Sequence, residues 1–195
     1  EEFIGEFSKY GSGDGEFIWG SGVVIDDEER VYVSDEWLNQ ISVFDQDGKF
    51  LRKWSALERE DGQAHGIASI TLGPDGNIYL TDGLSHEVRK FSKDGSFLAS
   101  WGQPGSADGE FNGPWGIATD QQGNVYVADH LNHRVQKFTA AGEWLAQFGS
   151  PGTGRGQIHL PPGVTVDPEG DVYICDWSHN GQHPGRVHVF DAGGN

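Results

Sequence analysis

One sequence pattern recurs four times along this chain at a constant spacing of 47 residues. The runs are VYVSD (31–35), IYLTD (78–82), VYVAD (125–129) and VYICD (172–176), and their final residues form one column: Asp35, Asp82, Asp129 and Asp176. Repeats of this length, made of short alternating strands between Gly- and Asp-containing turns, are typical of β-propeller blades. The sequence therefore predicts an all-β chain that contains four blades of four antiparallel strands each.

The third repeat shows the predicted blade most clearly. Its runs WGIATD, VYVAD, RVQKF and EWLAQF, between Trp115 and Phe148, are separated by the turn sequences QQGN, HLNH and TAAG. We expect four strands in meander order, a to d from the innermost outward. Strand b is apolar on both sides and should have a neighbouring blade against each face, whereas strand d should form a half-exposed rim. The predicted blades cover residues 19–54, 66–101, 113–148 and 160–195.

Two further columns indicate how the blades are built. Glycine occupies the a-to-b turn at positions 76, 123 and 170, where a positive φ is needed, but Glu29 takes this place in the first repeat. That turn is therefore either of a different type or mildly strained. Aspartates open the same turn at 26, 120 and 167, where a carboxylate can accept backbone N–H groups. The strand-b aspartates receive the same structural interpretation, because catalysis rarely needs four copies of one group.

The two ends of the chain match each other in phase. FIGEF (3–7) aligns with the strand-d run FLRKW (50–54), and the chain stops just after a strand c, at 186–195. We expect residues 1–7 to complete the fourth blade, which would remove two exposed sheet edges. Two alternatives stay open: a closed ring of four blades, or four blades' worth of a larger ring whose remainder is missing or supplied by another chain.

Charge and composition limit the function classes. The net charge of −17 argues against nucleic acid and anionic lipid as partners, and 35% hydrophobic residues suffice for a real core. No apolar run approaches the roughly 20 residues needed to cross a bilayer. The lone Cys175 lies within a strand and is expected to be a buried, inert thiol. The missing Met and the single thiol lead us to expect a trimmed form of a longer product in an extracellular or cell-envelope location.

The segment PWGIATDQQGNVYVADHLNHRVQKF (114–138) resembles the NHL repeat, whose Asn-His-Leu triplet corresponds to the region 131–135 here. The resemblance extends over essentially the whole chain through the shared columns. It implies a propeller, usually of six blades, which favours the larger ring, while the matched termini favour closure. Relatives include protein-binding modules of scaffold proteins, RNA-binding modules with a basic top face, and the peptide-amidating lyase, a zinc enzyme. The acidic charge argues against the RNA-binding branch.

Histidines and tryptophans concentrate at one end of the predicted blades. The d-to-a connections and b-to-c loops emerge on the same face of a propeller, and loops on a rigid scaffold commonly carry binding residues. The predicted binding face consists of Trp19, Trp37, His65, His86, Trp115, His130, His133, His159, Trp177, His179 and His183. Within this set, His133 and His86 are also candidates for hydrogen-bonding struts of the blade.

The fourth b-to-c loop is the one place where the repeat carries an insertion. WSHNGQHPG (177–185) replaces the four-residue HLNH of the third blade. Insertions in repeat proteins usually map to a loop on the working face, although a neutral insertion is equally compatible. A metal site there, for zinc or calcium, would use the imidazoles of His65, His159, His179 and His183.

The lyase resemblance is weak at its zinc ligands. It implies Pro-His-Gly segments at the starts of inner strands, but the matching segments read GSG (20–22), PWG (114–116) and PPG (161–163), and only AHG (64–66) is similar, out of register. The leading hypothesis is thus a non-enzymatic module that binds a protein, peptide or glycan, or that assembles through its blade edges. The alternative is a metal-dependent lyase or hydrolase. No catalytic residue and no definite cofactor are predicted.

Overall fold

The computed structural model describes residues 5–56, 66–177 and 185–194, and it confirms the all-β propeller architecture. The first blade consists of β1 (Gly20–Ile25), β2 (Val31–Asp35), β3 (Gln40–Phe44) and β4 (Phe50–Ser55), and the second of β5 (Ile67–Leu72), β6 (Ile78–Asp82), β7 (Glu87–Phe91) and β8 (Phe97–Trp101). The third consists of β9 (Pro114–Thr119), β10 (Val125–Asp129), β11 (Arg134–Phe138) and β12 (Trp144–Phe148), and the fourth of β15 (Val164–Val166), β16 (Val172–Asp176) and β17 (Arg186–Phe190). A 3-10 turn, η1 (His130–Asn132), follows β10, and a parallel pair, β13 (Ser150–Pro151) with β14 (Gln157–Ile158), lies between the last two blades.

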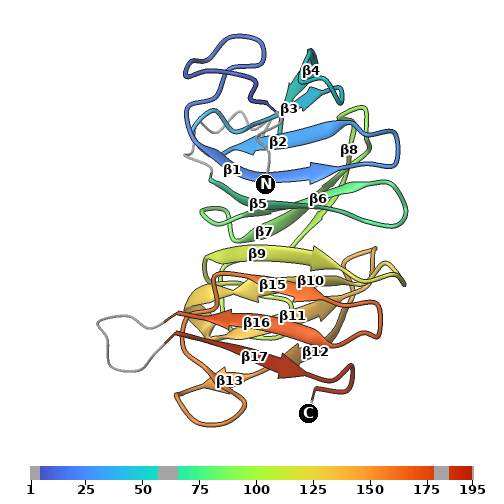
Figure 1. Ribbon diagram of the computed structural model, residues 1–195. Helices are drawn as coiled ribbons and strands as arrows, with labels where there is room; N and C mark the ends of the chain where they lie inside the picture. Colours follow the sequence, from blue (N-terminus) through green and yellow to red (C-terminus); the bar gives the residue numbers. More distant parts are fainter. Residues whose placement is uncertain (1–4, 57–65, 178–184, 195) are drawn as a thin grey trace.

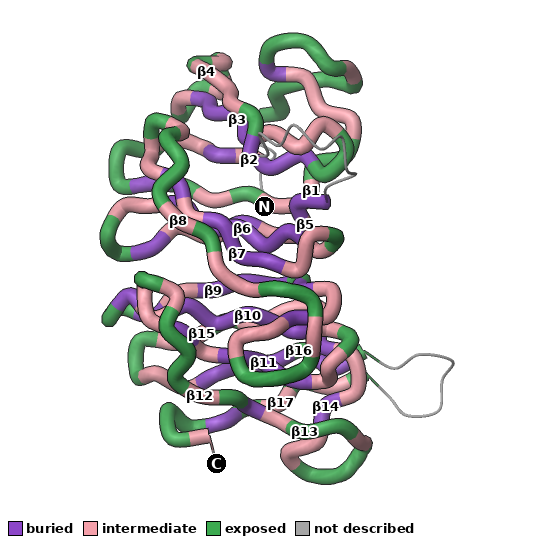
Figure 2. Tube along the Cα trace, turned by 180° about the vertical axis from the view of Figure 1, so that it is seen from behind, coloured by how far each residue is buried: buried purple, intermediate pink, exposed green. Residues whose placement is uncertain are grey.

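Each of the first three sheets is an antiparallel meander, as the sequence predicted, and the fourth has three strands within the described residues. Neighbouring blades meet through their inner strands: β1 contacts β5, β5 contacts β9, and β9 contacts β15. Figures 1 and 2 place the first and fourth blades at opposite ends of the molecule. The described blades therefore form an open row.

The hydrophobic core lies between the blades. It divides into three clusters, and each cluster joins two successive sheets. Strands β6 and β10 are buried along their whole length, which confirms the prediction for strand b, and Figure 2 shows these buried segments in the middle of the row. Strand d is partly exposed, for example at Leu98 (49%) and Leu145 (45%). Burial thus follows the position of each strand relative to the next blade.

A repeated contact joins each blade to the one that follows it. The turns between strands c and d carry a glycine with positive φ at Gly48, Gly95 and Gly142. A Cβ at these glycines would lie 2.6–2.7 Å from ring atoms of Phe7, Trp54 and Trp101, respectively. Trp54 and Trp101 lie on strand d of the preceding blade. Phe7 occupies the equivalent position of the repeat, 47 residues before Trp54. Only glycine permits this approach, because a side chain would collide with the ring.

Phe7 keeps the phase that the sequence predicted for the N-terminal segment. Its ring centroid lies 4.9 Å from that of Phe44 in the first blade. The equivalent contacts elsewhere are Trp101 with Phe138 and Phe148 with Phe190. Residues 1–4 lie outside the described part of the chain, so the pairing of residues 1–7 with β17 stays a prediction.

The a-to-b turns confirm the capping role of their aspartates. Asp120 Oδ1 accepts the backbone N–H groups of residues 122 and 124 at 3.0 and 2.8 Å, and its Oδ2 accepts the Tyr126 hydroxyl at 3.0 Å. Burial by itself raises the pKa of the equivalent Asp26, but hydrogen bonds from Arg30 and Tyr32 hold this pKa at about 2. Asp75 takes over this role in the second blade, where it accepts the Tyr79 hydroxyl at 2.8 Å.

Two sequence expectations about individual residues are resolved. Glu29 has φ 58°, close to the 73° of Gly76, so the first turn has the same left-handed conformation and carries the strain of a side chain there. Cys175 is exposed, and the expectation of a buried thiol was wrong. The counterparts of Cys175 are covered by the next blade, whereas the described residues place no blade over the fourth sheet.

Candidate functional site

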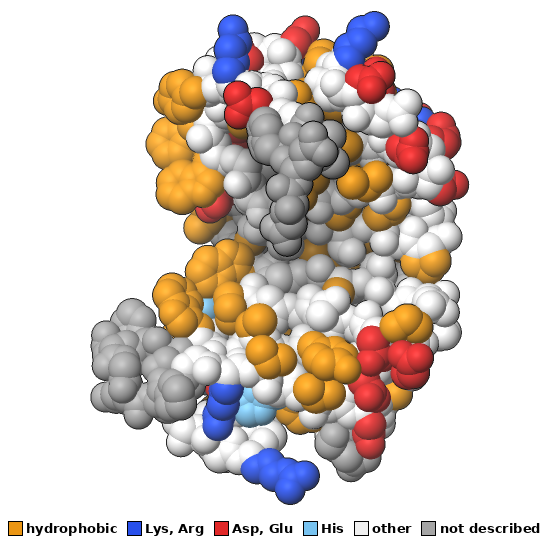
Figure 3. All heavy atoms as spheres, viewed as in Figure 1, with side chains coloured by type: hydrophobic (Ala, Val, Ile, Leu, Met, Phe, Trp, Pro, Cys, Tyr) orange, Lys and Arg blue, Asp and Glu red, His pale blue; other side chains and the backbone are white. Residues whose placement is uncertain are grey.

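The four predicted tryptophans lie at one end of the strands. Trp19 precedes β1, Trp37 follows β2, Trp115 is the second residue of β9, and Trp177 follows β16. Their exposed fractions are 61%, 67%, 37% and 48%, respectively. Figure 3 shows hydrophobic side chains gathered along the edge at which β1 and β9 begin and β16 ends, on the left of the view. The structure therefore presents these indoles to solvent on the loop face of the propeller.

Two leucines of this face were missed in the sequence. Leu84 and Leu131 occupy the position of Trp37 in the b-to-c loops of the second and third blades. Leu84 is 59% exposed and Leu131 is 51% exposed, and Trp37 in the same column is 67% exposed. Large apolar side chains exposed at the same position of three successive blades are unusual. The alignment at 47 residues contained the signal, because an apolar column inside a loop has no core to fill. We call Trp37, Leu84, Trp115, Leu131 and Trp177 the apolar face.

The apolar face has an aromatic centre where the third and fourth blades meet. The Trp115 and His130 rings pack edge to face with their centroids 4.4 Å apart, and the Trp177 centroid lies 6.2 Å from that of Trp115. His130 Nδ1 lies 3.1 Å from the carbonyl oxygen of Pro161, which fixes the imidazole. Burial lowers the pKa of His130, so its ring is neutral at neutral pH.

A hollow of about 220 Å³ adjoins this aromatic centre. Gly66, Gly83 and Gly113 contribute to its lining, and a Cβ at the first and last of these would lie only 3.4–3.5 Å from the neighbouring leucine side chains. The side chains around the hollow are those of Glu36, Ala68, Leu84, Pro114, Trp115, His130 and Leu131. The walls are thus mainly apolar, with one carboxylate and one imidazole among them.

The other described histidines have contacts within the scaffold. His86 Nδ1 accepts the backbone N–H of Gly113 at 2.9 Å and so bridges the second and third blades as a strut. His133 and His159 lie with their ring centroids 5.4 Å apart. Burial, followed by the nearby His159, lowers the pKa of His133. The histidines therefore contribute to blade contacts more than to the open surface.

The predicted metal ligands are only partly described. His65, His179 and His183 lie outside the described residues, and His159 is the member of the set that the structure places. Among residues 5–56, 66–177 and 185–194, no three His, Cys, Asp or Glu side chains converge in a way that could hold a metal ion. The metal site stays a prediction. In the same described part of the chain, no helix is long and apolar enough to cross a membrane.

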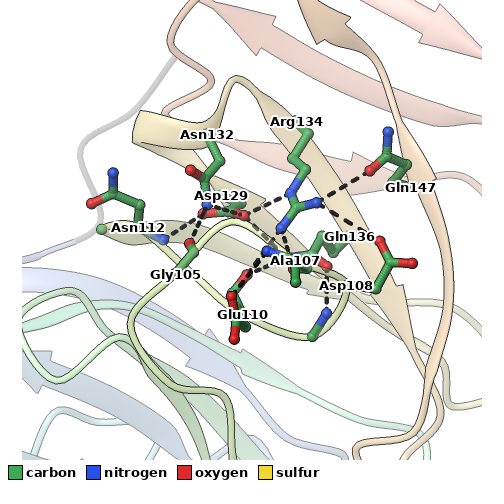
Figure 4. A network of polar contacts seen from close by, with 12 residues as sticks. Gly105, Ala107, Asp108, Glu110, Asn112, Asp129, Asn132, Arg134, Gln136 and Gln147 are labelled. Atoms are coloured by element: carbon green, nitrogen blue, oxygen red, sulfur yellow. Dashed lines mark hydrogen bonds and ion pairs between the residues drawn. The ribbon is translucent and has the colours of Figure 1, made fainter.

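The strand-b aspartates hold the loops of this face in place. The Asp129 carboxylate is fully buried and accepts the backbone N–H of Asn112 at 2.8 Å, Arg134 Nε at 2.8 Å, Asn132 Nδ2 at 2.9 Å and Gln136 Nε2 at 3.0 Å. Figure 4 shows these groups converging on one side chain from the d-to-a connection, the b-to-c loop and β11. The aspartate column is therefore part of blade construction, as the sequence predicted.

The first blade repeats this arrangement. Asp35 accepts the backbone N–H groups of Ile18 and Trp19 through Oδ2, at 2.7 and 3.2 Å, and those of Trp37 and Leu38 through Oδ1, at 3.0 and 2.9 Å. One carboxylate thereby ties together the two segments that carry Trp19 and Trp37. The backbone of the apolar face is fixed from below by hydrogen bonds.

Comparison with known proteins agrees with this architecture. The model of the NHL repeat matches residues 111–138. Protein lin-41 of Caenorhabditis elegans is 45% identical over 47 residues, which are 24% of this chain and 4% of lin-41.

Solved structures extend the likeness to nearly the whole chain. Virginiamycin B lyase from Staphylococcus aureus has a TM-score of 0.62 at 18% identity over 89% of this chain and 55% of the lyase chain. Hydrazine synthase from Kuenenia stuttgartiensis has a TM-score of 0.69 at 13% identity over 94% of this chain and 50% of that chain. The chain thus spans about half the length of these structures, and identities this low show the fold alone. Residues 111–138 match the NHL repeat, and the chain that contains them has a β-propeller fold.

Proposed function

We propose that this chain is a non-enzymatic binding module that takes an apolar segment of a partner protein on its apolar face. The observation that carries the proposal is the set of five large apolar side chains, 37–67% exposed, of which Leu84, Trp115 and Leu131 line one hollow. Exposed apolar surface of this kind has a cost in solubility and commonly marks an interaction site. Indole rings supply large, stiff contact areas and dominate many interfaces.

The chemistry of the hollow favours a peptide over a glycan. Its walls come from leucine, proline and tryptophan side chains, and the ionisable groups among them are Glu36 and His130. A buried sugar needs hydrogen-bond partners for many hydroxyl groups, whereas an apolar side chain needs none. The carboxylate and the net charge of −17 favour basic residues next to the apolar anchor. The proposed partner is therefore a protein segment with a large apolar side chain flanked by lysine or arginine.

A peptide selection tests this proposal. A phage-displayed library of random peptides, selected on the immobilised chain, should yield sequences with an apolar anchor and flanking basic residues. Affinities of the synthetic winners are then measured by titration calorimetry. Trp115→Ala and Leu84→Ala should each weaken binding about 10- to 30-fold, as expected for central interface residues.

The matched control is Leu145→Ala on the rim strand β12. Leu145 is 45% exposed, similar to the residues of the apolar face, but lies on the outer strand. Its substitution should leave the affinity unchanged. Selected peptides that bind all three variants as tightly as the unaltered chain would contradict the proposed site. Recovery of acidic or wholly polar peptides would contradict the proposed partner, and binding of oligosaccharides in their place would support the glycan alternative.

A further inference from the structure

The fourth blade exposes a sheet face that is largely buried in the preceding blades. We call this face, made of Tyr173, Cys175, Val187 and Val189, the outgoing face. Val187 is 61% exposed and Val189 is 54% exposed, and Tyr173 is half-buried. The hydrophobic side chains in the corresponding columns of the other blades are 0–1% exposed: Tyr32, Tyr79, Tyr126, Ala128, Ile41, Val88, Val135 and Val43. The Val189 column also contains Lys90 and Lys137, which are partly buried.

The first blade exposes the opposite face. We call this face, made of Val23, Ile25, Val31 and Val33, the incoming face. Val23 and Ile25 are each 62% exposed, and the other two are half-buried. In the following blades the Val23 column is only 6% exposed at Ile70 and Ile117, and the columns of Val31 and Val33 are fully buried: Ile78, Leu80, Val125, Val127, Val172 and Ile174.

These two faces are the halves of one interface that the chain already forms three times. Between the first and second blades, Tyr32 and Ile41 of the outgoing columns cluster with Ile70, Ile78 and Leu80 of the incoming columns. The same columns meet between the later blades. In all three described blade pairs, an outgoing face therefore packs against the incoming face of the next blade. Because the first and fourth blades lie at opposite ends of the open row, a second molecule can supply the missing half.

We propose that two copies of this chain pair head to tail, with the outgoing face of each copy packed against the incoming face of the other. This heterologous contact, made twice, closes into a two-fold symmetric ring. The ring would hold eight blades, which is within the roughly four to eight blades of known propellers, whereas three copies would exceed that range. Closure covers both exposed faces and leaves the apolar face free, so the assembly does not depend on the proposed peptide binding.

The repeat also specifies which residues should meet across the new interface. Gly22 lies between two blades: a Cβ there would be 3.2 Å from Ser34 Oγ of the same blade and 2.8 Å from Ile70 Cγ2 of the next. Ser34 therefore lies beside Ile70. Cys175 occupies the column of Ser34, and Val23 occupies the column of Ile70. Cys175 of one copy should consequently face Val23 of the other.

The first experiment measures mass by light scattering after size-exclusion chromatography. The mass measured for the unaltered chain should be twice the 21.3 kDa of one chain, and the mass measured for Val187→Glu should be that of a single chain. Leu98→Glu is the matched control: Leu98 is 49% exposed on rim strand β8, and its variant should remain a dimer. A monomeric unaltered chain would overturn the proposal. A monomer whose melting temperature falls on Val187→Glu substitution would indicate closure within one chain instead.

The second experiment tests the direction of pairing by cross-linking with the thiol oxidant diamide. Val23→Cys should form a disulfide with Cys175 of the second copy and give a covalent dimer on non-reducing gels. Neither the unaltered chain nor the double variant Val23→Cys, Cys175→Ala should do so. Failure of Val23→Cys to cross-link, or a covalent dimer of the double variant, would overturn head-to-tail pairing. Peptide binding by the Val187→Glu monomer is measured separately, so the two proposals can fail independently.

Discussion

Replacement of Asp129 by alanine should be among the most destabilising substitutions in this chain. The carboxylate is 0% exposed and accepts hydrogen bonds from one backbone N–H and three side chains. Two of those side chains, Arg134 and Gln136, are themselves buried at 7% and 0% exposure. The Asp129→Ala substitution would remove the carboxylate that accepts their hydrogen bonds, while both side chains stay buried. The guanidinium would be left as a buried charge without the carboxylate that neutralises it.

The expected loss follows from the cost of an unpaired buried charge. Removal of one partner from a buried ion pair typically costs about 3–5 kcal/mol, because the remaining charge cannot regain its water. Arg134 keeps hydrogen bonds to the carbonyl oxygens of Ala107 and Glu110 and to Gln147, which favours the lower half of that range. Because domains are stable by only about 5–15 kcal/mol, Asp129→Ala should remove a large fraction of the free energy of unfolding.

Urea unfolding followed by tryptophan fluorescence measures this loss. Asp108→Ala is the matched control, because Asp108 Oδ1 also lies within 3.9 Å of Arg134 Nη1, but its side chain is 58% exposed. An exposed partner is worth about 0–1 kcal/mol. The reasoning would be refuted if the two variants lost similar stability, since burial would then have no bearing on the value of the carboxylate.

Three further predictions concern the scaffold. Because burial lowers the pKa of His130, the unfolded chain binds a proton on this imidazole more readily than the folded chain does. The contribution of the neutral imidazole to stability is therefore fully present above the unfolded pKa of about 6.5, and the free energy of unfolding should fall as the pH drops below that value. Urea titrations at several pH values should show a smaller decline for His130→Asn. Glu29→Gly should raise the free energy of unfolding by about 0.5–1 kcal/mol, since glycine adopts the left-handed backbone conformation of this position without strain. An unchanged melting temperature would contradict the strain. Gly142→Ala should cost about 1–3 kcal/mol more than Gly109→Ala: both have φ above 80°, but a Cβ meets the Trp101 ring only at the first. Equal losses in the two glycine variants would show that the ring contact is unimportant.

Most of the fold could be predicted from the sequence because the same local pattern is repeated. Each strand b alternates between two buried faces, and each turn repeats its Gly or Asp, so one interpreted blade predicts the others. The exception in the second blade is instructive. Gly73 stands in the aspartate column, but Asp75 reaches the Tyr79 hydroxyl from two residues further on. The second blade thus lacks the aspartate at the expected position but keeps the hydrogen bond from the tyrosine hydroxyl to a carboxylate.

Burial at the ends of the row could not be predicted in this way. Cys175 and Val187 have counterparts that are fully buried, and their own sequence context is that of a core strand. Their exposure depends on whether another sheet packs against the fourth blade. No local pattern contains this information. The sequence could indicate what kind of surface these residues prefer, but only the arrangement of blades shows that the surface is open.

The hydrogen bonds of the strand-b aspartates connect the fold to the proposed binding. Trp37 follows Asp35 by two residues, and Leu84 follows Asp82 by two residues; in both loops the aspartate accepts the backbone N–H of that apolar residue, at 3.0 and 3.1 Å. The apolar side chains thus extend into solvent from backbone that buried carboxylates hold fixed. Preorganised backbone reduces the conformational entropy that binding must overcome, so exposed leucine and tryptophan side chains can act as ready-made anchors. In the first two blades the aspartate thus fixes the backbone, and the residue two positions after it determines which side chain the loop would present to the proposed partner.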